Sequence, residues 1–134
     1  MDENGRFRSK GFTIIELMIA LTIVAIILAL AYPSYVNYVR KSKRGDAQQA
    51  LMNWSVNQEI WRANHTSYAS TSDIAAPNLQ HYNLSTSGTP NATTYTLQAV
   101  AQGDQAKDKA RDGTSCTTLT LNQAGQKTPA VCWD

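Results

Sequence analysis

A single carboxylate, Glu16, lies inside an otherwise apolar stretch that runs from residue 12 to residue 32. As a helix rising about 1.5 Å per residue, these 21 residues are long enough to cross the ~30 Å hydrocarbon core of a bilayer. An ionisable side chain in such a segment is energetically expensive, so it indicates a function and requires a partner. The alternative is that Glu16, close to the start of the stretch, reaches the bilayer surface.

The two cysteines, Cys116 and Cys132, lie near the C-terminus with 15 residues between them. A lone pair at this separation favours a disulfide formed in an oxidising compartment. A metal site is the weaker alternative, because the chain has neither a C-x-x-C motif nor an accompanying pair of histidines. Three basic residues precede the apolar stretch and four follow it closely, so charge alone does not fix its orientation. The disulfide predicts that the C-terminal part lies outside the cytosol.

Basic residues alternate with aspartates between residues 102 and 113. Lys107, Lys109 and Arg111, with Lys127 as a further candidate, are side chains that contact phosphates in DNA complexes. The aspartates at positions 104, 108 and 112 would repel a phosphate backbone, which favours a solvated connection instead. A calcium site built from the three aspartates is a further alternative.

No pattern in the chain predicts an active site, a cofactor or a resident metal. His65 and His81 are 16 residues apart and have no clustered acidic partner, so neither a metal pair nor a catalytic triad is supported. The chain has 12 basic and 10 acidic residues, a balance that argues against strong nucleic-acid binding by bulk charge. We therefore expect a protein that is not an enzyme.

A second helical pattern follows residue 40. Mostly apolar residues, together with one glutamine, recur at spacings of three and four, which suits one face packed on a sheet. They are Ala47, Ala50, Leu51, Trp54, Gln58 and Trp61. The two tryptophans are interpreted as core residues rather than as a ligand-stacking pair, and the helix is expected to end near Asn64. Alternation predicts strands at 93–101 and 116–121, and further short strands are expected at 81–85 and 128–133.

The N-terminal motif resembles that of type IV pilins and related pseudopilins. Its residues are Gly11-Phe12-Thr13-Ile14-Ile15-Glu16-Leu17, preceded by a short charged leader and followed by an apolar helix with Pro33. The resemblance is strong over about the first 45 residues. The loop between the cysteines is similar to that of PilE-like and competence-type minor pilins. The implied fold class is α+β, with a long helix, half of it membrane-spanning, packed on a small antiparallel sheet.

The resemblance implies a processing site and a docking site. A prepilin peptidase would cut after Gly11, removing leader 1–11, and methylate the amino terminus of Phe12. Glu16 would then attract the Phe12 amino terminus of a neighbouring subunit. Pro33 would kink or open the helix, since proline lacks an amide hydrogen, although many relatives also have a glycine where this chain has Ala25.

The resemblance also implies an organisation and a function. A helix half at 12–39 would span the inner membrane and later form the filament core, and a head domain at 40–134 would be periplasmic. The protein would be a minor type IV pilin that enters or primes the pilus at the cell surface. Its partners would be other pilins, the peptidase and the inner-membrane assembly platform. The alternatives are a competence-type pilin that binds DNA and a pseudopilin of type II secretion.

Overall fold

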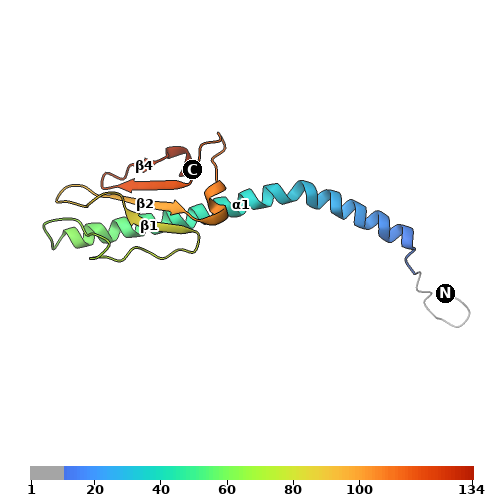
Figure 1. Ribbon diagram of the computed structural model, residues 1–134, viewed down its shortest axis with the longest axis horizontal. Helices are drawn as coiled ribbons and strands as arrows, with labels where there is room; N and C mark the ends of the chain where they lie inside the picture. The colour runs from blue at the N-terminus through green and yellow to red at the C-terminus, as the bar shows by residue number, and fades with distance from the viewer. Residues whose placement is uncertain (1–10) are drawn as a thin grey trace, which may run out of the picture. The chain divides into compact units, whose positions relative to one another are not determined.

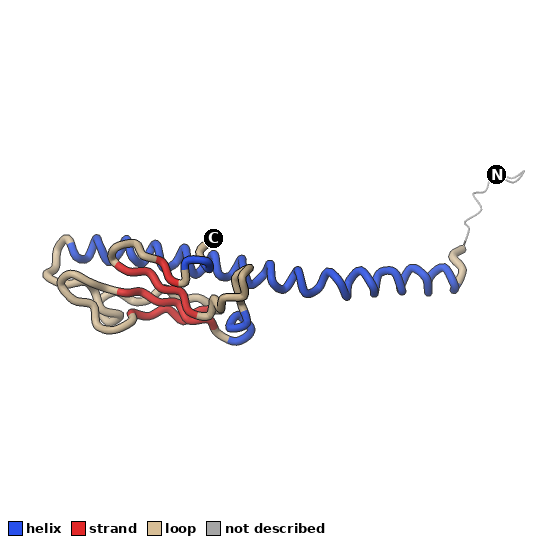
Figure 2. Tube along the Cα trace, turned by 90° about the horizontal axis from the view of Figure 1, so that it is seen from above, coloured by secondary structure: helices blue, strands red, loops and turns tan. Residues whose placement is uncertain are grey.

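The structure, a computed structural model, describes residues 11–134, so all but the last residue of the predicted leader lies outside the described part. The chain forms two compact units that divide between Val36 and Asn37. One helix, α1 (Ile14–Arg62), contributes its first part to one unit and its second part to the other. Figure 1 labels α1 and three of the strands described below, and Figure 2 distinguishes helices from strands and loops.

The first unit consists of the apolar part of α1. Thr13 caps the helix, because its Oγ1 accepts a hydrogen bond from the amide of Glu16 at 3.3 Å. Side chains from Phe12 to Tyr35 are exposed, and the most apolar window has a mean hydropathy of 2.8. The segment is therefore long and apolar enough to cross a membrane. Pro33 lies within α1, and the kink that it implies remains a prediction.

The second unit combines the rest of α1 with an antiparallel sheet. The sheet has four strands in the order β1-β2-β3-β4. Their bounds are Tyr82–Thr86, Thr96–Ala101, Thr118–Asn122 and Lys127–Thr128. Two short 3₁₀ helices, η1 (Gly103–Lys107) and η2 (Ala130–Cys132), follow β2 and β4. Both views place the sheet alongside this part of α1.

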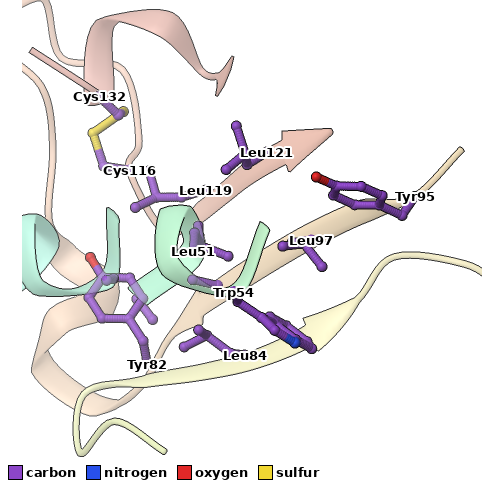
Figure 3. Close-up of a cluster of buried hydrophobic side chains, with 13 residues drawn as sticks. Leu51, Trp54, Tyr82, Leu84, Tyr95, Leu97, Cys116, Leu119, Leu121 and Cys132 are labelled. Atoms are coloured by element: carbon purple, nitrogen blue, oxygen red, sulfur yellow. A yellow bond between two sulfur atoms is a disulfide. The ribbon is translucent and has the colours of Figure 1, made fainter. Parts of the chain in front are cut away.

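The core lies between α1 and the sheet, where Figure 3 shows the side chains that fill it. Leu51 and Trp54 come from the helix, and Leu97 pairs across the sheet with Leu121. Alternate residues of β2 are buried, as the period of a half-buried strand requires. Each large apolar side chain buried here stabilises the fold by about 1.5–3 kcal/mol. Burial of Ala47, Leu51, Trp54 and Gln58 confirms most of the predicted helix face, and the alternation predicted for the second strand is confirmed. The prediction of Trp61 as a core residue is wrong, because its ring is only partly buried and stacks on His65 outside the core cluster.

The predicted disulfide is present between Cys116 and Cys132, with Cα atoms 5.7 Å apart. Closing a loop of this size stabilises a domain by about 3 kcal/mol in the chain-entropy model. The prediction of a last strand at 128–133 is wrong. β4 ends at Thr128 and η2 follows, because Pro129 has no amide hydrogen to continue the ladder.

Other predicted boundaries are shifted by one to three residues, those of the first and third strands included. The second strand begins at Thr96 rather than at Thr93, because the Asn91 side chain accepts hydrogen bonds from the amides of Thr93 and Thr94 and forms a turn there. Helix α1 ends at Arg62, two residues before the predicted end. These boundaries depend on local side-chain contacts that apolar periodicity does not detect.

Candidate functional site

The predicted processing and docking residues lie at the start of α1. The Phe12 side chain is 80% exposed, and Gly11 and Glu16 are also exposed. The cap on Glu16 uses its backbone amide, so the carboxylate itself takes no part in that hydrogen bond. Thr13 and Glu16 match the T-x-x-E capping pattern, a signal in the sequence that the resemblance left unused. The roles of these residues in processing and docking remain predictions.

Residues 102–113, which carry Lys107, Lys109 and Arg111, are called the basic segment. This segment, which follows β2, is fixed to helix α1 by a buried side chain. Gln105 of η1 is 3% exposed, and its Nε2 donates to the main-chain oxygen of Arg40 at 2.9 Å and to the Tyr82 hydroxyl at 3.0 Å. Burial raises the pKa of Tyr82, and the hydrogen bond from Gln105 opposes that rise. The prediction of 102–113 as a solvated connection is therefore wrong for Gln105 and Asp108, which are buried, while most other residues of the segment are exposed.

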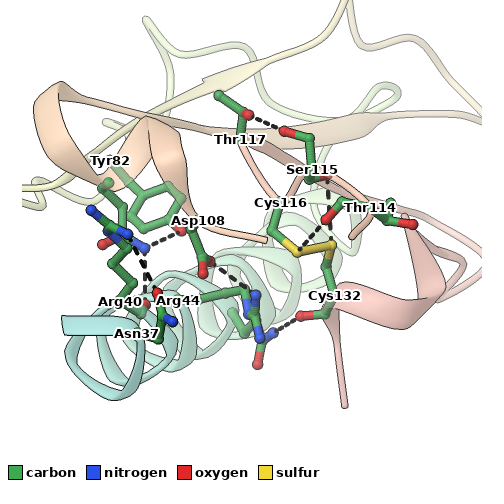
Figure 4. A network of polar contacts seen from close by, with 12 residues as sticks. Asn37, Arg40, Arg44, Tyr82, Asp108, Thr114, Ser115, Cys116, Thr117 and Cys132 are labelled. Carbon is green, nitrogen blue, oxygen red and sulfur yellow. Dashed lines mark hydrogen bonds and ion pairs between the residues drawn. A yellow bond between two sulfur atoms is a disulfide. The ribbon is translucent and has the colours of Figure 1, made fainter. Parts of the chain in front are cut away.

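Two arginines of α1 form ion pairs with two of the aspartates, as Figure 4 shows for Arg44 and Asp108. Arg44 Nη1 lies 2.9 Å from Asp108 Oδ2, and the two side chains are 5% and 4% exposed. Burial raises the pKa of Asp108, and the Arg44 guanidinium partly offsets the rise. Arg40 donates to Asp104 Oδ2 from Nη2 at 2.8 Å and from Nε at 3.1 Å. In each of the two pairs, the arginine and the aspartate are 64 positions apart in the sequence.

A tight turn presents the rest of the segment. Lys109 and Ser115 form an isolated antiparallel bridge, and the Gly113 amide donates to the Ala110 oxygen at 3.0 Å. Gly113 has a φ of +87°, a conformation that favours glycine. Asp112 Oδ1 accepts the Thr114 amide at 2.9 Å, and this contact lowers the pKa of Asp112. Arg111 is exposed in this turn.

The disulfide fixes the far side of this turn. The Cys116 amide donates to the Asp108 oxygen at 3.0 Å, and Gln48 Nε2 of α1 donates to the Cys132 oxygen at 2.6 Å. Ser115 and Thr117 join their hydroxyl groups in a hydrogen bond, also drawn in Figure 4. The segment from η1 to Cys116 is thus attached to α1 at both ends.

The predicted DNA-binding residues divide into two groups. Lys107, Lys109 and Arg111 are exposed on one short segment. Lys127 lies on β4, where its Nζ is 5.1 Å from the centroid of the Trp133 ring. Among the described residues, no hydrogen bond or ion pair joins Lys127 to the other three.

Sequence reasoning missed Arg40 and Arg44 as partners of this segment. They were counted only as flanking charges of the apolar stretch. Their spacing of four equals that between Asp104 and Asp108, and this shared spacing was the available signal. It is weak, because helices carry many charges four residues apart.

The alternative metal sites gain no support from these contacts. The three aspartates bind different groups: Asp104 binds Arg40, Asp108 binds Arg44, and Asp112 accepts a hydrogen bond from the Thr114 amide. His65 stacks on Trp61 with ring centroids 3.7 Å apart. Within residues 11–134, no group of three or more histidine, cysteine, aspartate or glutamate residues could hold a metal ion.

Family comparisons cover both units of the chain. Residues 6–32 match a family described as the prokaryotic N-terminal methylation motif. Residues 33–120 match a family described as type IV minor pilin ComP, DNA uptake sequence receptor. The chain is 30% identical to fimbrial protein EcpC of Eikenella corrodens over 115 residues, which cover 79% of this chain and 75% of that protein.

Other relatives match over shorter regions. The chain is 38% identical to type IV major pilin protein PilE of Neisseria gonorrhoeae over 74 residues, which cover 48% of this chain and 44% of PilE. A solved type IV pilin from Shewanella oneidensis superposes with a TM-score of 0.57 at 26% identity, covering 71% of this chain and 98% of that one. The minor pilin PilV of Neisseria meningitidis, with a TM-score of 0.54 at 17% identity over 69% of this chain and 87% of that one, shares the fold.

Proposed function

The chain belongs to the type IV pilin family, and from this premise we propose that it is a minor pilin whose head domain binds DNA at the surface of the pilus. A pilin is a structural subunit, so the protein is not an enzyme. Its apolar N-terminal helix fits a precursor anchored in the membrane. We do not propose the type II secretion alternative, because the relatives are named as pilins and fimbrial proteins.

The N-terminal motif supports a processing step before assembly. The methylation-motif match spans both Gly11 and Phe12, and both residues are exposed, so a peptidase can reach the bond between them. We propose that the inner-membrane precursor, with its head in the periplasm, is cut there. The assembly platform then adds it to other pilins. Glu16 pairs with the new amino terminus of a neighbour, where the low dielectric strengthens the attraction and desolvation reduces the net gain.

The arrangement of charge on the basic segment supports DNA binding, and it is the observation that carries the proposal. The objection from the sequence was that the interleaved aspartates would repel phosphates. Asp108 is buried against Arg44, and Asp104 is held by Arg40. Two of the three interleaved aspartates are thus offset by arginines, which makes the surface around Lys109 and Arg111 more positive than the sequence implies, while Lys107 also contacts Asp104 at 3.2 Å. The match of 33–120 to a family described as a DNA receptor agrees with this reading.

Phosphate contacts of this kind should depend strongly on salt, because each neutralised phosphate releases a counterion. We expect the full-length processed protein in detergent micelles to bind a mixed-sequence duplex with sub-micromolar affinity at physiological salt. Alanine at Lys107, Lys109 and Arg111 together should reduce the slope of log affinity against log salt by about three, or about one per lost contact. Fluorescence anisotropy measures both quantities. Lys41→Ala, at an exposed lysine of α1, controls for the loss of one charge, and Lys127→Ala tests the fourth candidate.

A purely structural pilin would behave differently in the same assays. Its affinity for duplex would be weak and the triple variant would match the wild type, while deletion of the gene would still reduce the number of pili. That result would replace the DNA receptor with a scaffold. Normal piliation of the triple variant together with lost DNA binding and lost transformation would support the receptor.

A further inference from the structure

One exposed carboxylate on the basic segment lies between two cations. Asp104 Oδ2 accepts two hydrogen bonds from Arg40, while its Oδ1 lies 3.2 Å from Lys107 Nζ. The Asp104 side chain is 62% exposed and that of Lys107 is 73% exposed, whereas that of Arg40 is only 16% exposed. Asp104 is thus the aspartate that can compete with a phosphate for Lys107.

Arg40 limits that competition by its geometry. It contacts Asp104 with two nitrogens from helix α1, and a two-point contact to an arginine is stronger and more directional than a contact to a lysine. Arg40 therefore engages Oδ2 of the Asp104 carboxylate, and only Oδ1 contacts Lys107. Arg44 contacts Asp108 through one nitrogen, and the Asp108 side chain there is only 4% exposed.

We propose that Arg40 and Arg44 are positioning residues for DNA binding, which engage Asp104 and Asp108 from helix α1 and so limit the competition of these carboxylates for the lysines of the segment. This inference rests on the proposed DNA-binding function. Arg40 acts through Asp104 and does not contact the phosphates. Asp104 is an internal competitor, and its removal strengthens binding.

The first test is a gain of affinity. Asp104→Asn frees Lys107, and we expect affinity for a mixed-sequence duplex to rise about two- to five-fold, the range that an exposed ion pair supports. Asp112→Asn is the matched control, since it removes one exposed carboxylate from the same segment but no ion pair. Asp112 contacts the Thr114 amide, and asparagine can keep that contact. If both variants gain equally, the effect is one of net charge and the proposal fails.

The second test separates positioning from direct contact. Arg40→Gln leaves the whole Asp104 carboxylate to pair with Lys107. The affinity for duplex should therefore fall about two-fold, the effect of a stronger exposed ion pair. The Gln105 bond to residue 40 uses a main-chain oxygen, so the thermal midpoint should not change. In the Asp104→Asn background, Arg40→Gln should have no effect beyond that of Lys41→Gln, which controls for one lost charge on α1.

The outcomes distinguish this inference from the function on which it rests. A further loss of affinity from Arg40→Gln in the Asp104→Asn background would show that Arg40 contacts DNA, and the positioning role would be wrong. If the wild type binds with a steep salt slope but Asp104→Asn shows no specific gain, only the inference fails. If the wild type shows no salt-dependent binding, both the function and the inference fail. Circular dichroism spectra that match the wild type establish that each variant is folded.

Discussion

The two units of the chain differ in whether key acidic side chains have ion-pair partners within the molecule. In residues 11–36 the only acidic side chain, Glu16, is exposed and has no ion-pair partner among the described residues. In residues 37–134 the aspartates at 104 and 108 are paired with arginines of the helix. One helix runs through both units, so the difference lies in what surrounds the helix and not in its secondary structure.

This difference separates charges that act within the molecule from charges that act between molecules. A buried ion pair is expensive to break because one charge is left without a partner. An isolated carboxylate in an apolar segment is expensive until a partner arrives. The paired charges therefore position the head's own surface, and the isolated one needs another subunit.

The largest effect is expected at the start of the first unit. Replacing Gly11 with tryptophan should abolish cleavage and leave only full-length protein in the inner membrane. No atom beyond its chain neighbours lies within 4 Å of the position of an added Cβ, so the substitution should not disturb the helix. Intact-mass measurement of membrane fractions gives the answer, with Gly45→Trp on α1 as a control. Normal cleavage of the Gly11 variant would remove the basis for a prepilin.

The next largest effect is expected at the isolated charge. Glu16→Gln should insert and be processed normally, yet pilus assembly should fall at least about ten-fold, as when a charge pair in a low-dielectric site is lost. The helix cap should survive, since it uses the backbone amide of residue 16. Counting pili and recovering subunits from sheared filaments measures assembly. Unchanged recovery would mean that Glu16 is only a surface-reaching carboxylate.

The buried pair of the second unit should behave as an intramolecular contact. Arg44→Leu leaves Asp108 buried and unpaired, so the free energy of unfolding should fall by about 3–5 kcal/mol. The double variant Arg44→Leu with Asp108→Leu should recover most of that loss, because no buried charge remains. Denaturant titration of the full chain measures both. A single variant within about 1 kcal/mol of the wild type would show that the pair is not desolvated as its geometry indicates.

The smallest effect concerns a buried tyrosine of the second unit. Burial raises the pKa of Tyr95 from 10.0 to about 12. The unfolded chain ionises this group near pH 10, so its contribution to stability is present below that pH and is lost as pH rises through about 12. Tyr95→Phe should make the decline of the unfolding midpoint above pH 10 shallower, by an equivalent of about 1–2 kcal/mol. Tyr38→Phe, at a side chain that is 74% exposed, should leave the profile unchanged.

Local patterns were sufficient to predict most of the fold. The helix, three of the strands and the disulfide follow from periodicities and spacings that a few neighbouring residues determine. The last strand was mispredicted, because the prediction at 128–133 did not take into account the missing amide hydrogen of Pro129. Sequence patterns indicate which residues favour a strand, but a strand also needs a hydrogen-bonding neighbour.

The site was predictable only in part. Its cations were found because their types are sufficient to propose phosphate contacts. The ion-pair partners of the aspartates were not predictable, because Arg40 pairs with Asp104 and Arg44 with Asp108 across 64 positions of sequence. Such contacts arise from how the segment after β2 packs on the helix, and no local pattern encodes them.

The bond between helix and loop at Gln58 has a consequence for how the head can vary. The Gln58 side chain is buried and exchanges two hydrogen bonds with the Ala69 backbone, at 2.8 and 3.0 Å. The side-chain amide thus takes the place of a neighbouring peptide group. It divides the long connection 63–81 into two short loops, each of which closes independently. Insertions in either loop should therefore be tolerated without shifting the sheet, and this part of the head can diversify while the fold is kept.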